Sequence, residues 1–217
     1  MLSTSLKQDL ISEKDMEVIF QRHIIEGESF YFNNILNEPE KEFELRRELS
    51  RELRISIRDT IIVGSAKIGF SIKTHNFIDF DSRFKKTSQR KHKSDIDIAI
   101  VSQQLFDELS EQLYKFTRHY DRDWINENWR INNYYSSLDP TKPKLPDNFF
   151  YYYAKGWFRP DYLPESFPPP WKETVSKWRD ILRRKISIGL YRDWKHLKNY
   201  QTDHLEKIKY KIKEMEI

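Results

Sequence analysis

The spacing of apolar residues predicts a helical start to the chain. Between residues 5 and 24, apolar side chains mix with charged ones in the way typical of an amphipathic helix, with a weak break near Ser12. A clearer helix begins near Pro39, which suits a first helical turn. Its apolar residues recur at every fourth position, as Leu45, Leu49, Leu53 and Ile57. We expect this stripe to pack against a core.

The pattern then changes from a helical to a strand-like period. The run TIIVGS is β-branched and ends in Gly64 and Ser65, which indicates a buried strand that enters a tight turn. AKIGFSI should follow as a short helical turn. DIDIAIV is the second expected strand, and Ser102 is placed to cap the next helix. The apolar face of that helix carries Leu105, Leu109, Leu113 and Phe116.

The second half of the chain is rich in aromatic residues. All six tryptophans lie beyond residue 120, and we expect most of these rings to pack in the core of a loop-dominated section that ends at FPPPW. Two helices should follow, with KISIGLY between them as a candidate strand. The expected apolar faces of the two helices are Trp171, Val175, Trp178 and Leu182 in the first, and Leu205, Ile208, Ile212 and Met215 in the second, which begins near Asp193.

Together these patterns predict one α/β (α+β) domain, with a small mixed sheet, flanking helices and an aromatic-rich helical C-terminal half. The core should cover about residues 38–118, including a basic insertion at about 73–93, and the helical part about residues 119–217. No segment has the apolar length of a transmembrane helix, and the start lacks the pattern of a signal peptide. The chain contains no cysteine, so we expect a cytoplasmic protein without disulfides or thiolate metal sites.

Asp95 and Asp97 are the strongest candidates for chemistry. Residues on a strand alternate between its faces, so these two carboxylates point the same way, and the small Ala99 leaves space beside them. Like charges this close are costly unless a cation lies between them. Mg²⁺ (or Mn²⁺) is such a cation, because it binds one or two carboxylates together with water and phosphate oxygens. The pair therefore predicts a metal site that receives a nucleoside triphosphate (NTP).

The turn after the first strand fits the same ligand. A glycine at a strand end lets the backbone approach a phosphate, and the N–H groups that follow can hold its oxygens. Gly64 and Ser65 are therefore candidate substrate-binding residues. Further candidates for contact with the substrate are Lys67, Ser71 and Ser94.

The order VGSAKIGFS and then SDIDIAIVS resembles the signature of the nucleotidyltransferase-fold (polymerase-β-like) superfamily, in its small stand-alone bacterial type. The resemblance covers about residues 60–118. It implies that Asp95 and Asp97 hold Mg²⁺ and are catalytic, while Gly64 and Ser65 contact the triphosphate. The implied reaction moves a nucleoside monophosphate from an NTP, ATP among them, to an RNA, protein or nucleotide acceptor. By analogy alone, a role in a toxin–antitoxin or antiphage defence system is plausible.

The chain departs from the family pattern at two places. The basic insertion separates Ser65 from Asp95, and it could clamp RNA or DNA by salt-dependent attraction. Many family members also carry a third carboxylate on a later strand, for which Asp161 and Asp193 are tentative candidates here. The alternative is therefore a catalytically inactive module of the same fold, which binds nucleotide or nucleic acid or regulates a partner protein. No membrane partner is expected.

Overall fold

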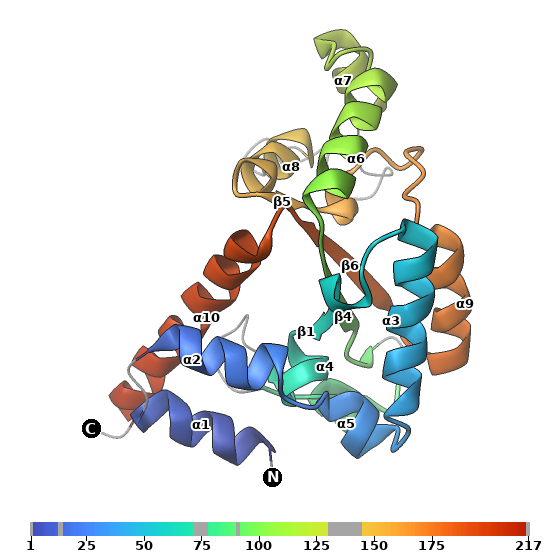
Figure 1. Ribbon diagram of the computed structural model, residues 1–217. Helices are drawn as coiled ribbons and strands as arrows, with labels where there is room; N and C mark the ends of the chain where they lie inside the picture. Colours follow the sequence, from blue (N-terminus) through green and yellow to red (C-terminus); the bar gives the residue numbers. More distant parts are fainter. Residues whose placement is uncertain (1, 13–14, 72–77, 90–91, 130–144, 216–217) are drawn as a thin grey trace.

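The computed structural model describes residues 2–12, 15–71, 78–89, 92–129 and 145–215. It confirms the α+β class, because a small mixed sheet of four strands carries flanking helices (Figure 1). Lys73, Arg90 and Lys91 of the basic insertion lie outside the described residues.

The four-stranded sheet has the order β1-β4-β6-β5 and contains all three runs expected to be strands. Its two longer strands, β4 and β6, are parallel neighbours, while β1 and β5 pair antiparallel at the two edges. A separate two-stranded ribbon joins β2 to β3. The bounds are β1 Thr60–Val63, β2 Phe70–Ser71, β3 Ile78–Asp79, β4 Ile96–Val101, β5 Trp157–Phe158 and β6 Ile186–Tyr191.

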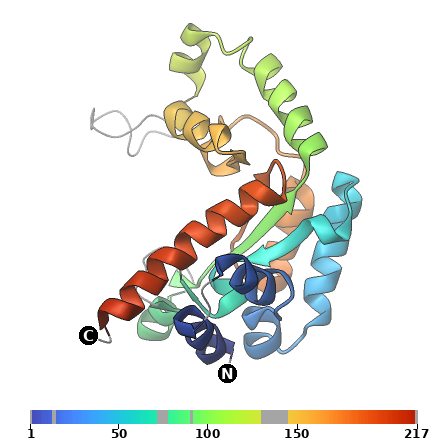
Figure 2. The same cartoon turned by 60° about the vertical axis from the view of Figure 1, so that its left-hand side comes forward.

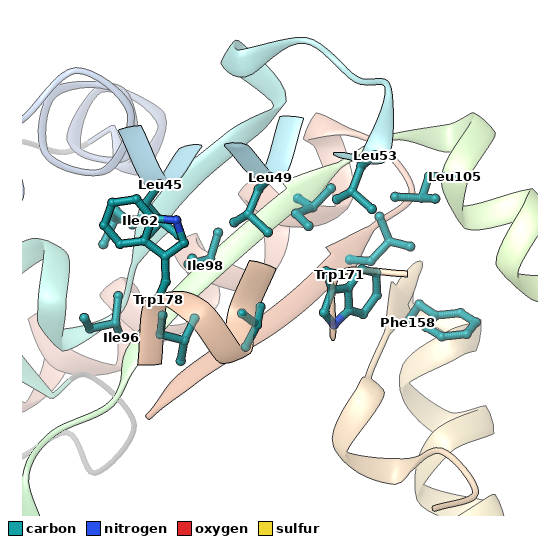
Figure 3. Close-up of a cluster of buried hydrophobic side chains, with 14 of the residues drawn as sticks. Leu45, Leu49, Leu53, Ile62, Ile96, Ile98, Leu105, Phe158, Trp171 and Trp178 are labelled. Carbon is teal, nitrogen blue, oxygen red and sulfur yellow. The ribbon is translucent and has the colours of Figure 1, made fainter. Parts of the chain in front are cut away.

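One face of the sheet packs against α3 (Glu40–Leu53) and α9 (Lys172–Leu182), which lie side by side in Figure 1. Figure 3 shows the isoleucines of β1 and β4 between the leucines of α3 and the tryptophans at the start and middle of α9. The expected apolar face of α9 is confirmed, and that of α3 is confirmed for Leu45, Leu49 and Leu53. Residues of this cluster that the figure labels are Leu45, Leu49, Leu53, Ile62, Ile96, Ile98, Leu105, Phe158, Trp171 and Trp178.

The opposite face packs against α10 (Trp194–Met215), α2 (Met16–Phe20) and α1 (Leu2–Ser12), and Figure 2 shows the length of α10 along it. Ile61, Val63, Ala99 and Val101 supply the apolar contacts of the sheet on this side. Leu205, Ile208 and Ile212 of α10 meet them, as the sequence predicts. The break near Ser12 is also confirmed, since α1 ends there.

The section after residue 120 is more helical than the sequence suggests. In place of a loop, it forms α7 (Arg122–Asn128) and α8 (Leu145–Ala154), which lie beyond the end of α6 (Gln103–Phe116). Asp121 caps α7 by accepting a hydrogen bond from the Trp124 N–H. Rings of α8 pack against α6 and β5, so tertiary contacts stabilise a segment whose sequence lacks a clear helical period.

Three further differences concern short elements. The helix expected to continue to Ile57 ends at Leu53, and Ile57 lies in η3 (Ile57–Asp59). The basic insertion is not only loop or ribbon, because it contains α5 (Ser82–Thr87). After α2 the chain winds through wide helical turns, and no described helix has the length and apolar character needed to cross a membrane. Those turns are η1 (Gln21–Ile25) and η2 (Tyr31–Ile35), and a short η5 (Pro160–Tyr162) follows β5.

Candidate functional site

The pairing of β1 with β4 brings the Gly64 bend to the acid pair. The register places Val63 opposite Asp97, so Gly64 follows at the mouth of β4. A Cβ atom built on Gly64 would lie 2.8 Å from the Asp97 carboxylate oxygen Oδ2. Two motifs that are distant in the sequence are therefore in contact in the structure.

Gly64 has a backbone conformation that other residues avoid. Its φ of 64° and ψ of −152° belong to a region open essentially to glycine alone. The chain then enters the single turn of α4 (Ser65–Ile68). The helical turn expected in AKIGFSI is confirmed only as far as Ile68, since Phe70 and Ser71 form β2. The N–H groups of Ser65 and Ala66 have no intrahelical acceptor, and no other described group accepts a hydrogen bond from them. Two backbone donors therefore lie next to a carboxylate, which is a suitable arrangement for a cation-bound phosphate.

Asp95 lies one residue before β4 and, by strand alternation, on the same side as Asp97. Lys185 Nζ donates a hydrogen bond to Asp95 Oδ2 at 3.1 Å, and both side chains are well exposed. The parallel register of β6 places Ser187 beside Asp97. The neighbours of Asp95 and Asp97 on the β6 side are thus Lys185 and Ser187, so β6 places no third carboxylate beside the two acids.

Asp95 and Asp97 have the carboxylate chemistry that suits Mg²⁺ or Mn²⁺, and the Asp97 carboxylate lies where a side chain on Gly64 would begin. In the described residues, no group of three or more His, Cys, Asp or Glu side chains is arranged to hold a metal ion. A metal here would therefore depend on these two carboxylates, on water and on oxygens of the substrate.

A buried ion pair fixes the chain just before the acids. Both nitrogens at the end of the Arg184 side chain donate to the Asp81 carboxylate, and both side chains are almost fully buried. Asp81 in turn accepts from the Ser94 N–H at 2.8 Å, while Ser94 Oγ accepts from the Asp81 N–H at 2.9 Å. Arg184 also donates to the Ser94 carbonyl. Ser94 is therefore engaged in holding the entry to β4, and its hydroxyl is used for this.

Two tyrosines share the sheet face of Asp97. Burial raises the pKa of Tyr191 and of Tyr200, that of Tyr200 to about 12, and the charge of Asp97 adds to both shifts. Both phenols therefore stay protonated at neutral pH and remain hydrogen-bond donors. The Trp157 ring stacks on Tyr191 and contacts Tyr200 with a centroid distance of 4.4 Å. Its indole nitrogen would lie 2.8 Å from a Cβ built on Gly189, so the ring covers the glycine of β6.

Lys67 and Ser71 are not brought to the acid pair by any described contact. The Lys67 side chain is buried, and its ammonium donates to the Gly27 carbonyl. Burial lowers the pKa of this lysine, and the charges that act on it belong to Glu42, Arg46 and Glu28. Ser71 lies in the β2–β3 ribbon opposite Ile78.

The two tentative third carboxylates have other partners. Asp161 is ion-paired with Arg159, whose guanidinium lies over the rings of Tyr152, Trp157 and Tyr162. Asp193 accepts from the backbone N–H of His196 and contacts the ring of the same residue at 2.8 Å.

Asp193 also lies at the wrong end of the sheet for a role beside Asp97. It lies two residues after the end of β6 and is six positions beyond Ser187, the neighbour of Asp97. This corresponds to about 20 Å along an extended strand.

Sequence reasoning missed Lys185, Ser187 and the Asp81–Arg184 pair. The first two were detectable, because aligning KISIGLY with DIDIAIV as parallel neighbouring strands places Lys185 beside Asp95 and Ser187 beside Asp97. The ion pair joins residues that are distant in the sequence, and no local pattern marks it.

Comparisons with protein-family models, with curated proteins and with solved structures found no match to this chain. What the site can do is therefore inferred from its own residues.

Proposed function

We propose that the protein is a Mg²⁺-dependent nucleotidyltransferase, which transfers a nucleoside monophosphate from an NTP to an RNA, protein or nucleotide acceptor. One observation carries the proposal: the Asp97 carboxylate lies against Gly64, in the place that a side chain would take, and the nearby N–H groups of Ser65 and Ala66 donate to no described group. An acid pair beside a glycine bend suits a triphosphate and its cation, because carboxylates are ligands that Mg²⁺ prefers and a bound cation reduces the repulsion between two like charges.

Each part of the site has a task in this reaction. The N–H groups of Ser65 and Ala66 would hold phosphate oxygens, and Asp95 and Asp97 would bind Mg²⁺. The ion supplies charge neutralisation at the phosphates. The acceptor oxygen bonds to the α-phosphorus, the bond from that phosphorus to the bridging oxygen breaks, and pyrophosphate leaves. The proton of the acceptor hydroxyl passes to water.

Removal of both carboxylates tests the proposal. With NTPs labelled at the α-phosphate and Mg²⁺, the parent protein should transfer label to an acceptor pool of RNA, protein and nucleotides. The Asp95→Ala/Asp97→Ala variant should transfer at least about 100-fold less, since several kcal/mol of charge stabilisation are lost. Its unfolding midpoint should stay near that of the parent. Equal transfer by parent and variant would overturn the assignment.

Two matched substitutions serve as controls for this assay. Asp193→Asn removes an acid at the far end of β6 and should leave transfer unchanged. Asp161→Asn removes the partner of Arg159, and we expect it to leave transfer within about threefold of the parent, which corresponds to about 0.7 kcal/mol. Loss of transfer in Asp161→Asn alone, with normal folding, would identify Asp161 as a third carboxylate.

A second candidate function is a catalytically inactive module that binds nucleotide or nucleic acid, or regulates a partner protein. The ion pair between Lys185 and Asp95 favours it, because the ammonium already supplies positive charge to one of the acids. Calorimetric titration with ATP and Mg²⁺, followed by the transfer assay, separates the two functions. Binding of ATP with no product from any acceptor would favour the module.

A further inference from the structure

The described part of the basic insertion carries an unbalanced positive charge. The described residues 78–89 and 92–93 set Asp79 and the buried Asp81 against four cations, Arg83, Lys85, Lys86 and Lys93. Of these cations, the first three are exposed and form no ion pair or hydrogen bond through their side chains with any described residue. Lys93 lies over the Phe84 ring at 5.1 Å. Surface lysines usually have acidic neighbours, and here such neighbours are missing from an entire short helix.

A second basic segment lies at the start of β6. Arg183, Arg184 and Lys185 are consecutive, and they have three different environments. Arg184 is buried in the ion pair with Asp81, whereas Arg183 is exposed and Lys185 is exposed beside Asp95. The buried arginine therefore separates two cations that remain at the surface.

The Asp81–Arg184 pair holds the two basic segments together. Asp81 is the residue directly before α5, and Arg184 lies between the two exposed cations of the second segment. Ser94 bonds to both of them, and the next residue is Asp95. The basic edge is our name for the surface cations of these segments, which are Arg83, Lys85, Lys86, the half-buried Lys93, Arg183 and Lys185. It adjoins the acid pair through Ser94, the residue before Asp95.

We propose that the acceptor is a polynucleotide strand, whose phosphodiester backbone binds along the basic edge while its terminal hydroxyl reaches the acid pair. Naming the strand as the acceptor rests on the proposed transferase function, whereas the binding itself does not. A polynucleotide combines a repeating negative charge with a hydroxyl that can receive a nucleoside monophosphate. A membrane surface fits less well, because α5 offers no exposed large apolar side chain for insertion.

Fluorescence anisotropy with labelled 20-nucleotide RNA and DNA of one sequence tests the binding. The parent should bind at least one of them at about 0.1 M salt, with an affinity that falls as salt rises. Lys85→Glu/Lys86→Glu should weaken binding at least tenfold. Neutralisation of the same pair in Lys85→Gln/Lys86→Gln should reduce the slope of log K against log salt by about 1.4, since each lost phosphate contact on a single strand contributes about 0.7. The nucleic acid that binds more tightly, RNA or DNA, shows whether the protein prefers ribose or deoxyribose.

A charge-matched control uses lysines far from the basic edge. Lys172→Glu/Lys195→Glu changes the net charge by the same amount, at the starts of α9 and α10. Both positions are exposed, and β6 and α9 each separate one of them from Lys185: Lys195 follows the far end of β6, and Lys172 begins α9, which ends just before Arg183. This variant should bind within about twofold of the parent. Arg183→Asn tests the second segment, and we expect a loss of about two- to fivefold; asparagine tolerates the left-handed backbone of this position.

The outcomes separate this inference from the proposed function. Absence of strand binding, equal loss in the charge-matched control, or binding only to acidic lipid vesicles would overturn the polynucleotide assignment. The Asp95→Asn/Asp97→Asn variant should keep strand binding, because it removes negative charge and no cation. Strand binding retained by the parent, together with no transfer of label to the strand or to any other acceptor, would instead overturn the transferase and leave the basic edge as a binding surface.

Discussion

The two faces of the four-stranded sheet are built on the same strands and differ in almost every other respect. The face toward α3 and α9 is formed by the isoleucines of β1, β4 and β6 and packs fully against leucine and tryptophan. The face toward α10 is formed by the alternate residues of the same strands. It carries Asp97, Ser187 and Gly189 at one end and apolar residues such as Val101 and Tyr191 at the other. One face therefore stabilises the fold, and the other combines packing at one end with a polar site at the other.

The difference shows where a small sheet can accommodate chemistry without losing its core. Because alternate residues of a strand serve opposite faces, Asp97 can lie beside Ile96 and Ile98 and still leave the isoleucine face dry. Arg184 and Asp81 bring a buried ion pair to the isoleucine cluster, and the Arg184 guanidinium lies 4.8 Å from the Tyr31 ring centre. The isoleucine face thus also fixes the loop that precedes the acids.

The largest effect is expected from breaking this buried pair. Arg184→Met leaves Asp81 buried without its counterion, and loss of one partner of a buried pair typically costs about 3–5 kcal/mol. Urea unfolding should therefore show a strongly reduced midpoint. Arg183→Met, at the exposed neighbouring position, is the matched control and should change stability by less than about 1 kcal/mol. Equal effects of the two substitutions would mean that the pair does not hold the two segments together.

Acid titration gives a second readout of the same pair. Burial alone raises the pKa of Asp81, but the hydrogen bonds from Arg184 and from the Ser94 N–H outweigh it, so the folded pKa lies below the usual value. A carboxyl with a lowered folded pKa stabilises the fold above its unfolded pKa of about 3.9, and this contribution is lost as pH falls through the folded pKa. The stability difference between the parent and Arg184→Met should therefore shrink below about pH 4. A difference that stays constant down to pH 2 would contradict this account.

The next effect contrasts the two faces directly. Ile98→Ala opens a cavity in the isoleucine cluster and should lower the free energy of unfolding by about 2–5 kcal/mol. Asp97→Asn, at the adjacent position on the other face, should change it by less than about 1 kcal/mol and yet abolish transfer. Urea unfolding and the label-transfer assay measure both properties for both variants. If Asp97→Asn destabilised the fold as much as Ile98→Ala, the acid would have a structural role.

The sequence predicts the isoleucine face well and the polar face in part. Leu45, Leu49 and Leu53 recur with the helical period, and TIIV and DIDIAIV have the β-branched character of buried strands, so local pattern was sufficient for these elements. Gly64 and Asp97 were also singled out, because each has a local chemical reason for its position.

Features that depend on pairing between distant segments become predictable only when that pairing is known. Lys185 reaches Asp95 only because β6 lies parallel to β4, and Arg184 meets Asp81 from across the chain. The helices α7 and α8 depend on ring packing against α6 and β5 and lack a strong periodic signal of their own.

The smallest effect concerns the end of α3, which covers the isoleucine face. The apolar spacing extends to Ile57 and predicts one more turn, but Arg54 takes a left-handed backbone with φ of 55° and ends the helix. The Ile55 N–H then bonds to the Ser50 carbonyl, and Ile55 packs on the isoleucine cluster, as in a Schellman ending. The packing of Ile55 thus favours the left-handed backbone of Arg54, a conformation that is unfavourable for residues other than glycine.

Arg54→Gly should therefore stabilise the protein, by about 0.5 kcal/mol, since glycine avoids the penalty of the left-handed region but adds entropy to the unfolded chain. Arg51→Gly, one turn earlier and also exposed, should destabilise by about 1 kcal/mol, because glycine weakens a helix interior. Opposite signs in urea unfolding would show that α3 ends at Arg54 for packing reasons. The same sign at both positions would favour the longer helix that the apolar spacing predicts, and would move Ile55 away from the isoleucine face.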